Sequence, residues 1–235
     1  MRSLLVAISL AMAAFPALAD TTAVYEGFGD FKLNIEIAAN GDFRMPAGLK
    51  PDQYFLVHNG EGFIVLSTAH GAVVDRLSDY ERAKAAVIDK QAPGLRAMVQ
   101  SEEPPAATPA DALVEIGAVT VNGRAGTGYY VDQQSAADHG APDYVISHDP
   151  ALAPLSAAMR RQSDMIRQLG GGMSITSASD KALDKLLETG GPLAFGPFKL
   201  TSLSIQPIAA SRFALPAPPE TPAAIRARIK TPDTN

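Results

Sequence analysis

The chain has 235 residues and contains no cysteine. Thiol catalysis is therefore excluded, and because no disulfide can form, the hydrophobic core must stabilise the fold alone. The absence also means that no cysteine can carry a lipid anchor of the kind found on bacterial lipoproteins. Hydrophobic residues make up 46% of the chain, which is enough for one large domain or two small ones with a real core.

Clusters of positive charge are missing as well. The chain has 20 Lys and Arg residues against 25 Asp and Glu residues, so its formal net charge is −5. The basic residues that stand close together, Arg226, Arg228 and Lys230, lie near the C-terminal end. A mildly acidic chain without a basic stripe is a poor nucleic-acid binder. We therefore expect no nucleic-acid partner.

Recognisable catalytic motifs are also lacking. The Gly-x-Ser-x-Gly elbow of hydrolases does not occur, and Gly170–Gly172 lacks the Lys-Ser/Thr pair of a phosphate loop. The glycines at 123, 126 and 128 reverse the spacing of the dinucleotide fingerprint and open a strand rather than a helix. Glycines that let a strand bend are the favoured interpretation. We assign no catalytic residue.

The histidines do not have the spacing of a metal motif. The four are His58, His70, His139 and His148. Asp138-His139 and His148-Asp149 flank one predicted strand and could meet in space, which would suit zinc. All four histidines stand at predicted turns or strand ends, however, so solvated loop histidines are favoured. We expect no metal and no other cofactor.

The first 19 residues have the parts of a secretory signal peptide. Met1-Arg2 supplies positive charge, Ser3–Phe15 is an apolar stretch too short to span a bilayer, and Ala17-Leu18-Ala19 is a small-x-small cleavage site. Cleavage before Asp20 would remove one charged residue, Arg2, and change the net charge from −5 to −6. No second apolar stretch is long enough to cross a membrane. We therefore expect a soluble protein in the bacterial periplasm or outside the cell.

Strand patterns are concentrated in the segment Leu113–His148. Valine, isoleucine and tyrosine dominate the runs Leu113–Val121, Thr127–Val131 and Asp143–Ser147. Asn122-Gly123 separates the first two runs, and an Asn-Gly pair between such runs indicates a hairpin, because a type I′ turn needs two residues with positive φ. The pair recurs at positions 40 and 59. Three such turns predict an antiparallel meander.

The N-terminal part of the chain predicts further strands. Phe31–Ala39 alternates between apolar and polar residues, as a half-buried strand does. One Asn-Gly turn leads from it to Asp42–Met45, and another joins Gln53–His58 to Gly62–Ser67. Every residue of Tyr54–Val57 is apolar or aromatic, so we expect this strand to be covered on both faces.

Three segments change to helical periodicity. Val73–Lys90 predicts an amphipathic helix whose polar side includes Asp75 and Asp79. Asp149-Pro150 predicts the start of a helix, and Ser179–Thr189 predicts a shorter one before a glycine stop. The apolar residues of the helix after Pro150, which we expect to face the concave side of the sheet, are Leu155, Met159, Ile166 and Leu169.

The C-terminal part predicts two more strands, Phe198–Ile205 and Ser211–Leu215. In the first, the apolar positions change parity at Thr201-Ser202, which indicates a β-bulge. The Pro-rich segment Pro93–Ala110 is predicted to be a loop. A small basic helix, Ala223–Lys230, is predicted in a loosely attached tail.

This order of elements resembles the periplasmic lipoprotein-carrier (LolA-like) superfamily, in an uncharacterised branch, over roughly residues 23–216. In such proteins a strongly curved antiparallel sheet, a half-barrel, wraps around helices, and its concave side can hold acyl chains. The resemblance therefore implies an α+β fold and an apolar ligand, and it implies no catalytic residue. The stretches that carry it are Phe55–Val65, Val119–Arg124, Tyr144–Pro150 and Ser211–Pro216.

We therefore expect a signal peptide at 1–19, a single LolA-like α+β domain at 20–216 and a Pro-rich, weakly basic tail at 217–235. The leading hypothesis is a non-catalytic module that binds an apolar, lipid-like molecule or an envelope partner. Two alternatives stay open: a hydrolase whose site is assembled from scattered His and Asp residues, and a structural envelope protein with a filled core. The residues expected to line the concave apolar side are Phe31, Leu33, Ile35, Ile37, Tyr54, Leu56, Phe63, Val65, Met159 and Ile166.

Overall fold

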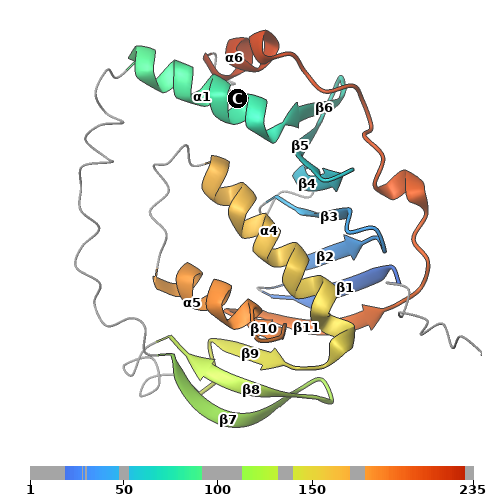
Figure 1. The fold of residues 1–235 in the computed structure, drawn as a ribbon, viewed down its shortest axis with the longest axis vertical. Coiled ribbons are helices and arrows are strands. Elements are labelled where there is room, and N and C mark those ends of the chain that lie inside the picture. Colours follow the sequence, from blue (N-terminus) through green and yellow to red (C-terminus); the bar gives the residue numbers. More distant parts are fainter. Residues whose placement is uncertain are drawn as a thin grey trace, which may run out of the picture.

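The fold is α+β and is built on one antiparallel sheet of eleven strands, in the order β6-β5-β4-β3-β2-β1-β11-β10-β9-β8-β7 (Figure 1). The computed structural model describes residues 19–27, 29, 31–47, 53–91, 113–131, 140–169 and 178–230. Among these residues β6 and β7, at the two ends of the order, do not pair with each other, so the sheet is not closed. The strands are β1 (Thr21–Glu26), β2 (Lys32–Ile37), β3 (Phe43–Pro46), β4 (Gln53–His58), β5 (Glu61–Thr68), β6 (Gly71–Arg76), β7 (Val114–Val121), β8 (Arg124–Tyr130), β9 (Tyr144–Ser147), β10 (Gly191–Phe195) and β11 (Phe198–Ser204).

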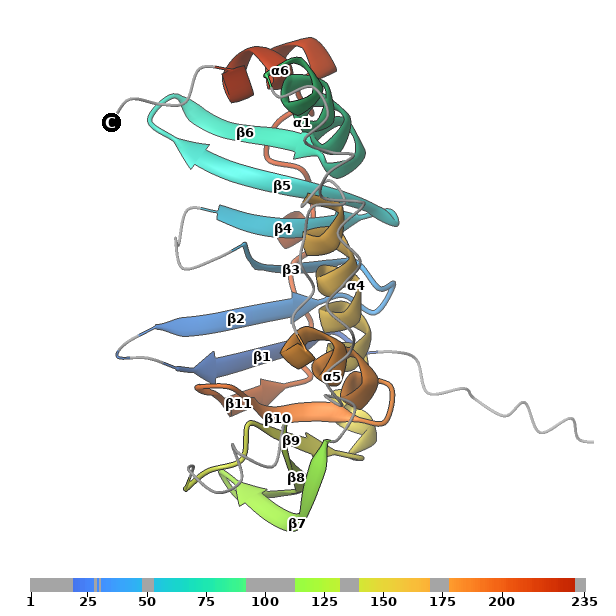
Figure 2. The same cartoon turned by 90° about the vertical axis from the view of Figure 1, so that its left-hand side faces the viewer.

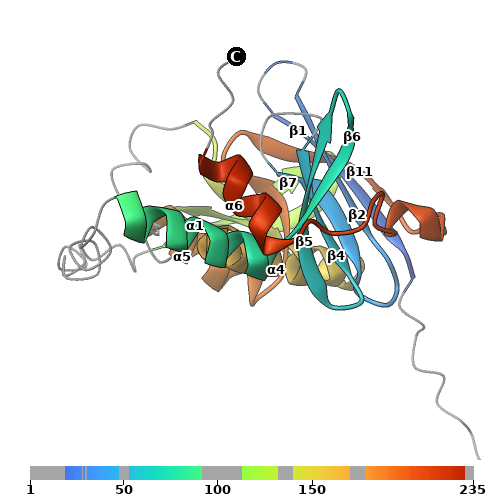
Figure 3. The same cartoon turned by 90° about the horizontal axis from the view of Figure 1, so that it is seen from above.

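Four α-helices accompany the sheet in the described part of the chain. Figure 2 shows α4 and α5 on one side of the strands, and α1 and α6 together beyond β6. Seen from above, α6 lies alongside α1 (Figure 3). The helices are α1 (Leu77–Gln91), α4 (Ala153–Leu169), α5 (Ala178–Leu187) and α6 (Pro222–Lys230), with 3₁₀ turns η1 (Pro150–Leu152) and η2 (Ala210–Arg212).

All three Asn-Gly pairs lie in the predicted hairpin turns, and two of them have type I′ geometry. Both residues of Asn59-Gly60 and of Asn122-Gly123 have positive φ, as a type I′ turn requires. In Asn40-Gly41 only the glycine has positive φ, at 86°. There the Ala38 amide donates to the Asp42 carbonyl at 2.8 Å, so the loop contains three residues, with glycine in the left-handed position. The meander β7-β8-β9 is confirmed.

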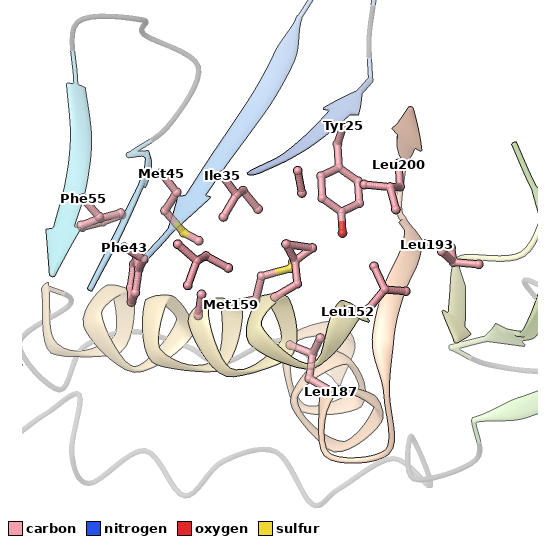
Figure 4. Packing of buried hydrophobic residues seen from close by; sticks show 14 of the residues in the cluster. Tyr25, Ile35, Phe43, Met45, Phe55, Leu152, Met159, Leu187, Leu193 and Leu200 are labelled. Atoms are coloured by element: carbon pink, nitrogen blue, oxygen red, sulfur yellow. The ribbon is translucent and has the colours of Figure 1, made fainter. Parts of the chain in front are cut away.

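The main core lies between α4 and one face of the sheet (Figure 4). Ile35 from β2, Met45 from β3 and Tyr25 from β1 are each at most 1% exposed, and they meet Leu155 and Met159 of α4. Asp149 caps the preceding 3₁₀ turn, because its side chain accepts a hydrogen bond from the Ala151 amide at 3.0 Å. The start at Asp149-Pro150 is thus confirmed.

The opposite face of β4, β5 and β6 is covered by the C-terminal segment 205–220. Phe213 from this segment is 5% exposed and packs against Leu56, Phe63 and Val65. Arg212 pairs with Glu36 of β2 through both carboxylate oxygens. Because Phe55 and Val57 of β4 face the other core, the prediction that this strand is covered on both faces is confirmed.

The C-terminal segment also corrects two predictions. Ser211–Leu215 is no strand, since η2 occupies its first residues. The helix predicted at Ala223–Lys230 is present as α6, but it is not loosely attached: Ile225 is fully buried and the Glu220 amide donates to the Val74 carbonyl at 2.7 Å.

The predicted helix Val73–Lys90 begins too early. Residues up to Arg76 belong to β6, where Val73 pairs with Leu66 of β5, and α1 begins at Leu77. Asp75 is consequently fully buried in a strand, and Asp79, also expected on a polar face, is only 5% exposed. The predicted loop Pro93–Ala110 lies outside the described residues.

The bulge predicted in β11 is present. Val24 of β1 pairs with Ser202, whereas Tyr25 pairs with Leu200, so Thr201 is the extra residue. Sequence reasoning missed β1 and β10 as strands. β1 pairs with β2 on one side and with β11 on the other, and β11 in turn pairs with β10, so the late strand β11 lies in the middle of the sheet.

Candidate functional site

The structure brings together four of the residues predicted to line the concave side. Ile35, Ile37 and Met159 belong to the core cluster beneath α4, and Leu33 packs at its edge. Phe31 lies further out, where its ring meets Phe198 edge-to-face with a centroid distance of 5.8 Å. These residues therefore share one face of the sheet.

Four other predicted lining residues lie on the opposite face. Leu56, Phe63 and Val65 form the second core with Phe213, and Tyr54 packs against it. The prediction that they share a lining with Ile35 is wrong. In a strand covered on both faces, hydrophobicity does not indicate which parity faces which layer.

Ile166 is also placed wrongly by sequence reasoning. It is 47% exposed, whereas the neighbouring Met165 is 3% exposed and belongs to the core beneath α4. Ala158 and Met165 are seven residues apart and so follow one row along the helix. In the C-terminal half of α4, the side of the helix that carries Met165 contacts Gly62 and Leu77. The side that carries Met159 and Ile166 does not.

A pocket of about 420 Å³ opens where the C-terminal half of α4 meets the corner formed by β5, β6 and the start of α1. Its apolar surface comes from Gly62, Leu77 and Met165. The residues that line it are Glu61, Gly62, Arg76, Leu77, Ser78, Arg161, Asp164 and Met165. No sequence signal could have identified this pocket, because its walls come from segments about 100 residues apart.

Of the arginines around the pocket, some form ion pairs with carboxylates and one does not. Arg76 lies 3.3 Å from Glu61 and 3.5 Å from Asp79, so its charge is offset. Asp164 is paired with Arg167, which also pairs with Asp184 of α5; these carboxylates raise the pKa of Arg167. Arg161 donates to the Gly60 carbonyl and forms no ion pair within the described ranges.

The core beneath α4 contains one deeply buried hydroxyl. The Tyr25 hydroxyl group donates to the Pro192 carbonyl at 2.7 Å, and the Tyr25 side chain is 0% exposed. Burial raises the pKa of Tyr25 above its ordinary value, so the phenol stays neutral. Because this hydroxyl group is neutral and hydrogen-bonded, it needs no further polar partner in the apolar core.

The described histidines lie at the surface or at strand ends. His58 Nδ1 is 3.4 Å from Asp42 Oδ2, and His148 Nδ1 lies 2.8 Å from the Thr189 carbonyl oxygen. Asp138 and His139 lie outside the described residues. Among the residues that are described, no group of three His, Asp or Glu side chains could hold a metal ion.

No helix in the described ranges is both long enough and apolar enough to cross a membrane. Comparison of the chain with protein-family models, with curated proteins and with solved structures gives no match.

Proposed function

We propose that this chain is an exported, non-catalytic module that binds an apolar, lipid-like molecule between α4 and a strongly curved half-barrel sheet. The observation that carries the proposal is the way in which α4 packs on the sheet. The amphipathic helix α4 covers the middle of the apolar face of an unclosed eleven-stranded sheet, and methionines from the helix and from the sheet meet there. Methionine adapts to irregular apolar ligands, because its side chain is unbranched and polarisable.

The contacts at the sides of α4 support its role as a movable cover. Gln162 donates to the Pro46 carbonyl at 3.3 Å, Ser156 donates to the Gly190 carbonyl at 2.7 Å, and Arg160 pairs with Glu188 at 3.1 Å. Water can replace these polar contacts when the helix moves, whereas the exposed apolar face needs another cover. An acyl chain would supply it.

Side chains now fill the space beneath α4. Ile35, Met45 and Leu155 are each at most 1% exposed, so a ligand can enter only if α4 moves away from the sheet. The proposal therefore predicts that a covalent tether between α4 and the sheet blocks uptake of the ligand. The absence of cysteine from the chain allows such a tether to be placed at will.

The test introduces Ala47→Cys and Gln162→Cys, one on each side of the contact at Pro46. A bis-maleimide cross-linker then joins α4 to the sheet, and uptake of the neutral fluorescent probe N-phenyl-1-naphthylamine is titrated. We expect the parent and both single variants to bind the probe and the cross-linked protein to lose most of that binding. If the cross-linked protein takes up as much probe as the parent does, α4 is not a movable cover. If the parent takes up no probe, the binding function is refuted and the alternative of a structural protein with a filled core remains.

A further inference from the structure

We infer that the pocket beside Arg161 receives the anionic headgroup of a single-chain amphiphile whose tail passes Met165 into the core beneath α4. This inference rests on the proposed function and adds the chemical class of the ligand and its orientation. The pocket and the core share two residues, Leu77 and Met165. Met165 lines the pocket and is also a member of the core cluster, and its side chain is 3% exposed.

The anionic preference follows from the charges around the pocket. The acidic groups there, Glu61, Asp79 and Asp164, each pair with Arg76 or Arg167. Arg161 contacts only a backbone carbonyl in the described part of the chain, and no described carboxylate forms an ion pair with it. A guanidinium has five N–H donors, and one bond to Gly60 leaves donors for a phosphate or a carboxylate.

The amphiphilic character of the ligand is inferred from the apolar residues at the floor of the pocket. Gly62 and Leu77 meet Met165 there, and the absent side chain at position 62 lets Met165 pack closely on β5: a Cβ added to Gly62 would lie 3.1 Å from Met165 Cε and 3.6 Å from Leu77 Cδ2. A volume of about 420 Å³ suits a headgroup and the first carbons of a chain. Rotation of the flexible Met165 side chain then opens the way into the core.

The experiment compares dodecyl phosphate and laurate with the neutral glycerol monolaurate, all below their critical micelle concentrations. Each displaces N-phenyl-1-naphthylamine from the parent, from Arg161→Gln and from the matched control Arg160→Gln. Arg160 is the neighbouring arginine on α4, but it pairs with Glu188 and does not line the pocket. We expect the parent to prefer both anions by at least about 5-fold, and the preference to weaken with salt.

Arg161→Gln should lose this preference and keep its affinity for the neutral amphiphile, whereas Arg160→Gln should behave as the parent does. Gly62→Val, which crowds Met165 at the floor of the pocket, should weaken binding of the anions. Equal affinities of the parent for anionic and neutral chains, equal effects of the two arginine variants, or unchanged anion binding in Gly62→Val would overturn the headgroup site and leave the proposed function standing. Failure of all three amphiphiles to displace the probe would overturn the proposed function itself.

Discussion

Arg228 of α6 donates a hydrogen bond to Asp75 of β6, so an ion pair joins two residues 153 positions apart. The Asp75 side chain is completely buried, and Glu220 lies 3.5 Å from the same guanidinium group. Burial raises the pKa of Asp75 above its ordinary value, and the neighbouring Arg228 opposes that shift. The pair therefore fixes α6 to the edge strand of the sheet.

Replacing Arg228 with Gln should destabilise the protein by about 2 kcal/mol at pH 7, because a buried carboxylate is left without its partner. Since the pKa of Asp75 is raised in the folded state, the unfolded state loses this proton first as the pH rises above the ordinary value of 3.8. The contribution of Asp75 to stability thus falls with rising pH, and removal of Arg228 should deepen that fall. Urea unfolding of parent and variant between pH 4 and pH 7 measures it.

Asp75→Asn is the control for this pH dependence. An amide can still accept a hydrogen bond from Arg228 and cannot ionise, so the variant should lose less stability at pH 7 than Arg228→Gln and should show a flatter pH profile. A loss of stability in Arg228→Gln that is the same at pH 4 and pH 7 would contradict the assignment.

Met165 and Ile166 provide a direct test of how α4 is oriented. Met165→Ala should destabilise by about 2–4 kcal/mol, because it leaves a cavity between α4, Gly62 and Leu77. Ile166→Asp, at a position that is 47% exposed, should change stability by about 0.5 kcal/mol or less. Chemical unfolding of both variants checks this, and a larger effect at Ile166 would mean that α4 is rotated.

These two residues also illustrate how far the sequence predicts the fold. The Asn-Gly turns and the bulge at Thr201 were predicted correctly, because local conformation and strand parity determine them. The rotation of α4, the burial of Asp75 and the face on which Leu56 lies depend on partners distant in sequence. The pocket was not predictable at all, because Arg161 and Gly62 are polar or small residues without a pattern of their own.

Gly191 allows close approach between β10 and η1. A Cβ added there would lie 2.2 Å from Leu152 Cβ and 2.9 Å from the Leu152 carbonyl oxygen. Gly191→Ala should therefore destabilise by at least about 2 kcal/mol, since the backbone of the turn must shift. Gly140→Ala, where an added Cβ meets no atom of the described residues within 4 Å, is the matched control and should be nearly neutral. Equal melting temperatures for the two variants would rule out this contact.

Asp20 joins the turn after β2 to the C-terminal segment. Its Oδ1 accepts from the Ala39 amide at 2.8 Å, and its Oδ2 accepts from the Ile208 amide at 2.7 Å. Asp20→Ala should cost about 2 kcal/mol, and Asp20→Asn should cost less because one acceptor remains. Glu26→Gln, which weakens an exposed pair with Lys32, should change stability by about 0.5 kcal/mol or less.

Cleavage between Ala19 and Asp20 is predicted from the sequence, and residues 1–18 lie outside the described ranges. Intact-mass measurement of protein recovered from a periplasmic fraction should show a chain that begins at Asp20. A mass that includes residues 1–19, or recovery only with membranes, would contradict both the signal peptide and the soluble form.

The central position of β11 determines when the sheet can form. β1–β6 and β7–β10 are each contiguous blocks of strands, and β11 alone hydrogen-bonds to both, through β1 and β10. Until residues 198–204 have been synthesised, no strand hydrogen-bonds to both blocks, although α4 packs against strands of each. We expect the pairing of β11 with β1 and β10 to be a late step of folding, because it is a non-local pairing of the kind that slows folding. Until then, two unpaired strand edges are open to other chains, and a chaperone that holds the nascent chain would act in this interval.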